Sequence, residues 1–210
     1  MSIQETNQDW LVNDESQCLP LTTELNDLQE DSFTPPYRLY RFLTDIEDII
    51  WQEKDDRLRL QKICPLVRRL LNSSEWILTS FLLPDRETGW SVQMLYDEPD
   101  FALTVQTVAW SPQSISPIHN HGSWGIVALI DGAEKNTFWQ RSPTPEFPDR
   151  IVKTGEHILM AGDILCLMPN AIHQIEVIGD EPTISFNIYG ITDYSKRFEF
   201  DVERRTAKVF

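Results

Sequence analysis

The sequence SPIHNHG at residues 116–122 contains two of the chain's four histidines, His119 and His121, two positions apart. Side chains at i and i+2 of a β-strand project from the same face, so a strand here would present both imidazoles together. Neutral imidazoles are frequent metal ligands. The spacing therefore indicates two ligands of a metal site, and a pair of polar residues at the mouth of a strand is the alternative that it leaves open.

A third histidine follows at a distance that a folded sheet can close. His173 lies in the apolar run 172–178, eleven residues after Gly162, and the turn at Gly162 can bring this run back across the fold. We therefore predict His173 as the third metal ligand, with a half-exposed strand residue as the alternative. His157 stands in the polar sequence TGEH and is predicted to lie in a surface loop.

The sequence on both sides of these histidines has the period of β-strands. After Trp90, short alternating apolar runs replace the three- and four-residue spacing that precedes them. Turn sequences such as Asp131-Gly132 and Gly179-Asp180 separate the runs. The pattern predicts a mainly β barrel or sandwich over residues 89–210. The runs are residues 91–96, 101–110, 124–130, 134–140, 164–168, 172–178 and 183–189.

Residues 34–88 have the pattern of a helical annex. Thr34-Pro35 is typical of a helix start, and apolar residues then recur at three- and four-residue intervals over residues 39–50. A second apolar series occupies residues 60–71. Pro65 is expected to divide this series into two helices, because proline in a helix interior costs about 3 kcal/mol.

Residues 1–33 are predicted to form a loosely ordered acidic tail. The first 31 residues include eight Asp or Glu and no Lys or Arg, and their apolar residues show no sustained period. An interaction arm is the alternative reading of the same charges.

The composition of the whole chain limits its class. Its 210 residues, 41% of them hydrophobic, suit one domain with a sizeable core. A formal net charge of −15 makes binding to nucleic acid or to an anionic membrane unfavourable. The chain has three cysteines without a CxxC motif, no visible targeting segment and no apolar run of membrane-spanning length, and we therefore predict a cytoplasmic protein. Sheet edges and a helical annex permit a dimer without requiring one, so we expect either a monomer or a homodimer.

The histidine motifs resemble those of the cupins, a superfamily of double-stranded β-helix barrels. In the first cupin motif a His-x-His precedes a Glu ligand and a later Gly; here Gly132 takes the Gly position and Gly125 takes the Glu position. The distance from Gly162 to His173 matches the second motif. The resemblance implies a mainly β cupin (jelly-roll) barrel with an N-terminal helical annex and a centre of three histidines. Glu134 is predicted to have a rim or structural role.

The chain resembles in particular the thiol dioxygenases, which include cysteine dioxygenase and the bacterial 3-mercaptopropionate dioxygenases. The sequence PIHNHGSWG at residues 117–125, followed by DGAE at residues 131–134, is similar to their metal-binding motif. Trp110, nine residues before the first motif histidine, matches a family tryptophan. The sequence SFNIYG at residues 185–190 resembles their closing Ser-x-His-x-Tyr strand, with Asn187 in place of His.

The resemblance implies that His119, His121 and His173 hold Fe(II). The activity that it implies is the oxidation of a small thiol carboxylate, cysteine or 3-mercaptopropionate, to its sulfinate by O2. Two alternatives remain: a metal-binding cupin that catalyses a different reaction, such as ring or diketone cleavage or an isomerisation, and a non-catalytic cupin module that binds its ligand without turnover.

The resemblance also implies roles for five further residues. Ser185, Asn187 and Tyr189 take the catalytic positions and share one strand face, although the amide of Asn187 cannot titrate as an imidazole does. Gln93 and Trp110 take substrate-binding positions. Because a neutral amide lacks the charge-assisted fork of an arginine, Gln93 favours 3-mercaptopropionate or another small thiol over cysteine.

Overall fold

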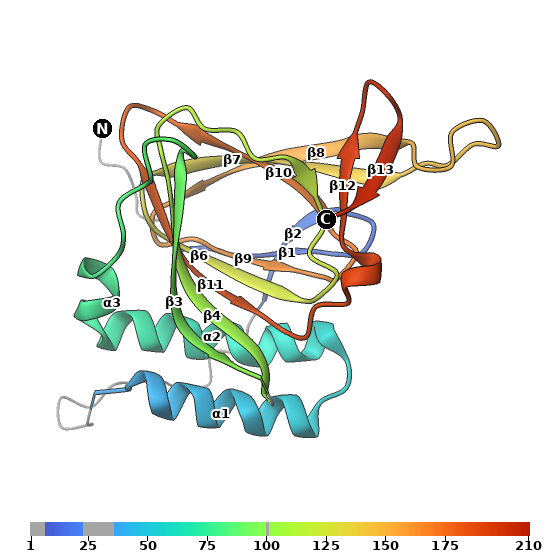
Figure 1. The fold of residues 1–210 in the computed structure, drawn as a ribbon. Helices are drawn as coiled ribbons and strands as arrows, with labels where there is room; N and C mark the ends of the chain where they lie inside the picture. The colour runs from blue at the N-terminus through green and yellow to red at the C-terminus, as the bar shows by residue number, and fades with distance from the viewer. Residues whose placement is uncertain (1–6, 23–35, 100) are drawn as a thin grey trace.

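Two β-sheets face each other in the computed structural model, which describes residues 7–22, 36–99 and 101–210 (Figure 1). One sheet has the strand order β2-β1-β9-β6-β11-β4-β3, and the other has the order β13-β12-β5-β10-β7-β8. The seven-stranded sheet consists of β1 (Asp9–Val12), β2 (Cys18–Pro20), β3 (Trp90–Glu98), β4 (Phe101–Trp110), β6 (Gly125–Asp131), β9 (Ile164–Leu167) and β11 (Thr183–Tyr189). The six-stranded sheet consists of β5 (Ile118–His119), β7 (Ala133–Arg141), β8 (Ile151–Met160), β10 (Ile172–Ile178), β12 (Phe198–Asp201) and β13 (Thr206–Val209).

The chain crosses repeatedly from one sheet to the other between β4 and β12. Strands β4, β6, β9 and β11 lie in the seven-stranded sheet, and the strands between them in sequence lie in the six-stranded sheet. Within the sheets the pairs along this part of the chain are antiparallel. This alternation closes a jelly-roll barrel. The prediction of a mainly β, cupin-type barrel with an N-terminal helical annex is therefore confirmed.

Two long helices cover the outer face of the seven-stranded sheet (Figure 1). Helix α1 (Leu39–Gln52) packs on α2 (Asp56–Ser73), α2 contacts β6 and β9, and the short α3 (Glu75–Thr79) follows. The Asp55 carboxylate caps α2 by accepting a hydrogen bond from the backbone N–H of Leu58 at 2.9 Å. The predicted start at Thr34-Pro35 lies outside the described residues. Among the helices that the structure describes, none combines the length and apolar character needed to cross a bilayer.

Helix α2 continues through Pro65, so the predicted division of this segment into two helices is wrong. The reason is the burial of its apolar face against the barrel. Each large apolar side chain that is fully buried contributes about 1.5–3 kcal/mol, and several together outweigh the cost of about 3 kcal/mol for an internal proline. The buried residues of α2 are Leu60, Ile63, Cys64, Val67 and Leu70.

Strand β6 is apolar along most of its length because both of its faces are buried. Ile126 belongs to the apolar cluster that the sheet shares with Phe42 of α1. Its neighbour Val127 faces the other sheet and joins a second cluster with Phe138. A strand covered on both sides loses the polar alternation of a surface strand. Val127 also lines the cavity described below, so the apolar core between the sheets ends at that cavity.

Part of the N-terminal segment is built into the seven-stranded sheet. Strand β1 pairs in parallel with β9, with Leu11 opposite Cys166, and β2 folds back on β1. Asp9 forms an ion pair with Arg68 of α2. The predicted loosely ordered tail is therefore wrong for residues 9–20, because a four-residue strand is too short to show a period. The remainder of the tail, residues 1–6 and 23–33, lies outside the described residues.

Replacing Leu11 with Ala should lower the free energy of unfolding by about 2–5 kcal/mol, the usual cost of truncating a buried leucine. Leu11 is 2% exposed, whereas Leu19 of the neighbouring β2 is 46% exposed and provides the matched control. We expect Leu19→Ala to change stability by about 0.5 kcal/mol. Urea denaturation followed by far-UV circular dichroism measures both losses, and equal losses would contradict the role given to β1.

Glu134 of β7 is buried between the sheets rather than placed at the rim, which agrees with a structural role. Its Oε1 accepts a hydrogen bond from Thr183 Oγ1 at 2.7 Å. Its Oε2 has no hydrogen-bond partner in the part of the chain that the structure describes. Burial raises the pKa of this carboxyl from 4.5 to about 7.

A carboxyl whose pKa rises on folding destabilises the protein progressively as the pH rises from the unfolded pKa to the folded pKa. We therefore expect wild type to lose about 2–3 kcal/mol of stability relative to Glu134→Gln between about pH 5 and pH 8, at 1.36 kcal/mol per pKa unit. The difference between the two proteins, measured by urea denaturation across this range, cancels contributions from other groups. A difference independent of pH would contradict the burial of an ionisable Glu134.

Candidate metal centre

Three histidines converge between the sheets. His119 of β5 and His173 of β10 are direct partners in an antiparallel pair, and His121 follows two residues after His119. One ring nitrogen of each histidine lies within 4.8 Å of the others, and the Nε2 atoms of His121 and His173 are 3.0 Å apart. The three predicted ligands are thus brought together. His157, predicted for a surface loop, instead lies in β8 and packs on Trp10, with ring centroids 3.9 Å apart.

The turn after His121 requires a glycine. Gly122 has a φ of +63°, and a Cβ atom at this position would lie 2.7 Å from the backbone oxygen of Asp193. The Gly122 carbonyl accepts a hydrogen bond from the backbone N–H of Asp193 at 2.9 Å. Only glycine tolerates both this conformation and this close approach. The glycine directly after His121 is therefore required by the conformation of the loop that carries this histidine.

Two of the imidazoles make outer hydrogen bonds that fix which nitrogen faces the cavity. His119 Nδ1 lies 2.9 Å from the carbonyl oxygen of Pro117, and His173 Nδ1 lies 3.0 Å from Oδ1 of Asn136. Both oxygens can only accept, so each Nδ1 carries the proton and donates it. The Nε2 lone pairs of His119 and His173 are therefore available to a metal ion, as they are in metal sites whose histidines have such outer partners.

The charge state of the histidines also fits a metal ion. Burial lowers the pKa of all three, and for His121 the neighbouring His119 and His173 lower the pKa further. Neutral imidazole is the form that binds metals. Among the described residues the group contains three imidazoles and no carboxylate. Such a nitrogen-only donor set suits a divalent transition metal better than Mg²⁺ or Ca²⁺, which prefer oxygen ligands.

Tyr189 of β11 lies directly beside the histidines and lines the same cavity. Its ring stacks on His121, with centroids 4.6 Å apart and an interplanar angle of 26°. Tyr189 lies opposite Gly125 in the pair of β11 and β6, and a Cβ atom at Gly125 would lie 2.8 Å from Tyr189 Cδ1. Gly125 therefore makes room for the tyrosine ring. Burial raises the pKa of Tyr189 well above its usual value, so its hydroxyl stays protonated.

Ser185 and Asn187 line the same cavity wall as Tyr189, as their shared strand face predicts. Both are buried. Within the described residues no hydrogen bond joins the three side chains, and Asn187 Oδ1 has no hydrogen-bond partner. The three residues therefore form a polar wall beside the histidines rather than a hydrogen-bonded chain.

A cavity of about 480 Å³ extends from the histidines along β3, β4 and β11. Trp110 lines this cavity, as predicted. Gln93 is not among the lining residues, so the prediction that places it in the substrate site is wrong. Side chains alternate along a strand, and neighbours of Gln93 on either side face the cavity, so Gln93 faces away. The glutamine that does line the cavity is Gln106 of β4, which lies opposite Asn187. The cavity-lining residues of β3 are Trp90, Val92, Met94 and Asp97.

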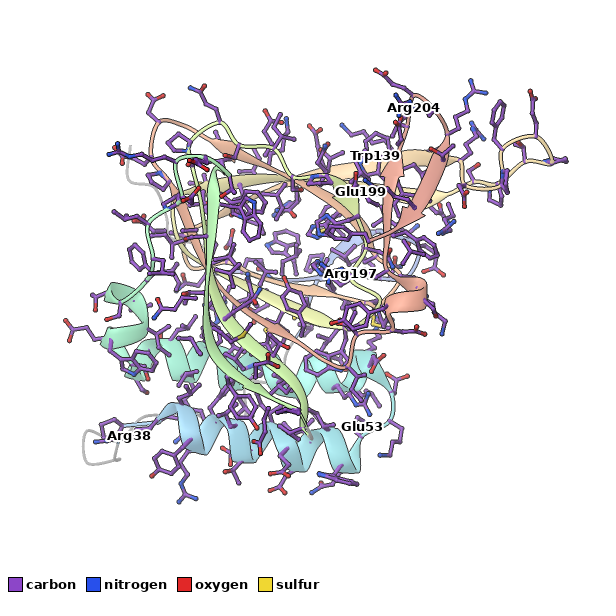
Figure 2. The ribbon with its side chains drawn as sticks, in the orientation of Figure 1. Arg38, Glu53, Trp139, Arg197, Glu199 and Arg204 are labelled. Carbon is purple, nitrogen blue, oxygen red and sulfur yellow. The ribbon has the colours of Figure 1, made fainter. Side chains whose placement is uncertain are left out.

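Arg197 is a charged cavity residue that the sequence analysis did not identify. It follows the 3-10 turn η1 (Tyr194–Lys196), and Figure 2 shows it in the space between the sheets. Its guanidinium carbon lies 4.4 Å from the centroid of the Phe210 ring. Its Nε is buried and has no hydrogen-bond partner among the described residues. Arg197 is the single cationic residue of the described cavity lining, and its charge lowers the pKa of both His119 and His121.

No protein-family model matches the chain. Among solved structures it is similar to a cupin superfamily protein from Desulfitobacterium hafniense, with 14% identity over 51% of this chain and 82% of the other and a TM-score of 0.39. It is also similar to KdgF from Halomonas, with 14% identity, 52% and 86% coverage and a TM-score of 0.39. A third similar structure is an oxalate decarboxylase from Lactobacillus farciminis in a formate complex, with 18% identity, 55% and 32% coverage and a TM-score of 0.43.

At this identity and structural overlap, the similarities carry no information about activity. The chain's own strand order and side chains define its class: a cupin-type β-barrel with a candidate metal centre of three histidines.

Replacing Asn136 with Ala should weaken metal binding about 10- to 100-fold, the usual effect of removing an outer hydrogen-bond partner of a histidine ligand. Asn136 is 1% exposed, and its Oδ1 accepts a hydrogen bond from His173 Nδ1. Asn170→Ala, in an exposed loop, is the control. Competition with a chromophoric chelator for Zn²⁺ gives the affinities. Unchanged affinity in Asn136→Ala, with circular dichroism as in wild type, would contradict the assigned hydrogen bond.

Proposed function

We propose that this protein is an Fe(II)-dependent dioxygenase that oxidises a small thiol carboxylate, such as cysteine or 3-mercaptopropionate, to its sulfinate. The observation that carries the proposal is the combination of three clustered imidazoles without a carboxylate among them and a single arginine in the same cavity. A neutral ligand set favours a substrate that brings its own anionic ligand, and a buried cation favours a second anionic group on that substrate.

His119, His121 and His173 would hold the metal ion. Bound there, Fe(II) would coordinate and deprotonate a thiol and leave a position for O2. Overall, a thiolate and O2 give a sulfinate: the sulfur loses four electrons and receives both oxygen atoms. The balance therefore needs no additional reductant.

Arg197 supports the choice of a carboxylate substrate. Its guanidinium is partly covered by Phe210, and its unpaired Nε is buried. A buried donor without a partner costs about 1–3 kcal/mol, and a carboxylate would remove that cost with a charge-assisted hydrogen bond. Because Gln93 lies outside the cavity, it gives no reason to prefer 3-mercaptopropionate over cysteine.

Tyr189 supplies a protonated hydroxyl beside the centre. Its ring stacks on His121, and the missing side chain at Gly125 leaves room for it. A phenol with a raised pKa donates a hydrogen bond and does not act as a base near neutral pH. We therefore assign Tyr189 to orienting the substrate's polar groups, while Asn187, which cannot titrate, contributes only hydrogen bonds.

Oxygen uptake tests the proposal directly. Anaerobically Fe(II)-loaded protein is mixed with O2 and cysteine, 3-mercaptopropionate, cysteamine or buffer, and sulfinate is quantified by mass spectrometry. We expect thiol-dependent uptake with one sulfinate per O2, abolished in His173→Ala. Stoichiometric iron binding without uptake would contradict the proposal. In that case thiol binding without turnover would assign a binding module, and O2-independent chemistry would assign a different metal-dependent reaction.

Replacing Arg197 with Met should lower kcat/KM for 3-mercaptopropionate about 10- to 100-fold, the loss expected for one charged hydrogen bond. Cysteamine has no carboxylate, so its kcat/KM should change by less than about threefold. Arg141, which packs on Phe198 at 4.9 Å and does not line this cavity, provides the control as Arg141→Met. Equal losses for both thiols in Arg197→Met would contradict carboxylate binding by Arg197.

A further inference from the structure

The cavity is several times larger than a small thiol needs. Its volume is about 480 Å³. At the packing density of organic matter, a ligand with six or seven non-hydrogen atoms occupies on the order of 100 Å³. Pockets of about 300–1,000 Å³ normally enclose much larger ligands. The volume beyond the histidines and Arg197 is therefore large enough to take a further part of a ligand.

The additional volume lies along an apolar strip on the inner faces of β3 and β4. Val92 is paired with Val108, and two positions along, on the same face of the sheet, Trp90 is paired with Trp110. The two indole rings are in contact, with centroids 6.1 Å apart and an interplanar angle of 34°. We call this surface the tryptophan strip; it consists of Trp90, Val92, Met94, Val108 and Trp110, all of which line the same cavity as the histidines.

The tryptophan strip is accessible because β3 is the outermost strand of its sheet (Figure 1). Trp90 is 43% exposed and Met94 is 47% exposed, although both face the cavity. Aromatic and sulfur-containing side chains that face a cavity and remain accessible are typical of ligand contacts. At about 3.3 Å per residue, the strip extends about 13 Å from Met94 to Trp90.

The strip begins beside the candidate centre. Met94 is paired with Gln106, and Gln106 is paired with Asn187 of the polar wall. From this row the strip continues past Val92 towards the tryptophan pair, away from Tyr189 and His121. A ligand fixed at the histidines and Arg197 would therefore extend a substituent along the strip.

We propose that the tryptophan strip is a second substrate subsite, and that the substrate is a thiol carboxylate with an extended apolar or aryl substituent. The inference rests on the proposed function for the thiol and the carboxylate, and on the strip for the substituent. Burial of the substituent on Met94, Val92 and the indole pair gives the favourable free energy, since apolar area removed from water is stabilising in proportion to its extent.

Binding of two carboxylates without a thiol tests the subsite separately from the oxidation. Anaerobic Fe(II)-loaded protein is titrated by calorimetry with propionate and with 5-phenylpentanoate. Neither contains the thiol, so turnover does not complicate the measurement. We expect 5-phenylpentanoate to bind at least about tenfold more tightly than propionate. Similar affinities for the two ligands would overturn the proposal.

Variants identify where the phenylalkyl group binds. Trp90→Ala and Met94→Ala should each reduce the preference for 5-phenylpentanoate about fivefold or more. Trp76→Ala is the control, because Trp76 is 45% exposed and lies on α3, outside the cavity lining. Both strip residues are partly exposed, so their replacement should leave folding intact, which circular dichroism checks. A preference unchanged in both strip variants would also overturn the proposal.

The outcomes separate the subsite from the activity. A strip-dependent preference in a protein that oxidises no thiol would support the subsite and contradict the dioxygenase. Oxidation of 3-mercaptopropionate without any preference for the phenylalkyl carboxylate would support the dioxygenase and overturn the subsite.

Discussion

The pairing of His119 with His173 across β5 and β10 is the contact on which the rest of the site depends. It places two imidazoles side by side in one sheet, and the turn at Gly122 brings His121 to the same point. The backbone oxygen of Pro117 and the amide of Asn136 then orient the two paired rings. Strand register and two outer hydrogen bonds thus set the positions and orientations of these imidazoles.

The opposite sheet determines what else can reach this centre. The absence of a side chain at Gly125 lets the Tyr189 ring stack on His121. A larger side chain at position 125 would collide with that ring, because even a Cβ atom there would lie 2.8 Å from Tyr189 Cδ1. Arg197 then brings positive charge into a protein whose formal net charge is −15. Asp97 also lines the cavity, and Arg197 supplies the cation that an anionic group of a ligand would contact.

The features that could be predicted from the sequence are local or periodic. The alternation after Trp90 predicted seven of the strands but not β5, β8, β12 or β13. The spacing of His119 and His121 predicted two ligands that share a face. The continuous helix at Pro65 could not be predicted, because its stability comes from packing on the barrel rather than from propensity. The β1 strand was missed for a similar reason, since four residues carry no measurable period and its pairing with β9 spans most of the chain.

Site residues outside the motifs depended on register and loop geometry. Gln93 and Gln106 are both glutamines on adjacent strands, but only Gln106 faces the cavity, and a shift of one residue along β3 would reverse this for Gln93. Arg197 lies in the connection between β11 and β12, where no periodic pattern indicates which way a side chain points.

X-ray absorption spectroscopy at the iron edge, on anaerobic Fe(II)-loaded protein with and without 3-mercaptopropionate, tests the central claim most directly. The account predicts multiple scattering from three imidazole rings and one sulfur neighbour after the thiol is added, with a weaker ring signal per iron in His173→Ala. A spectrum without imidazole scattering, or one that the thiol leaves unchanged, would contradict the three-histidine centre as a site of thiol oxidation.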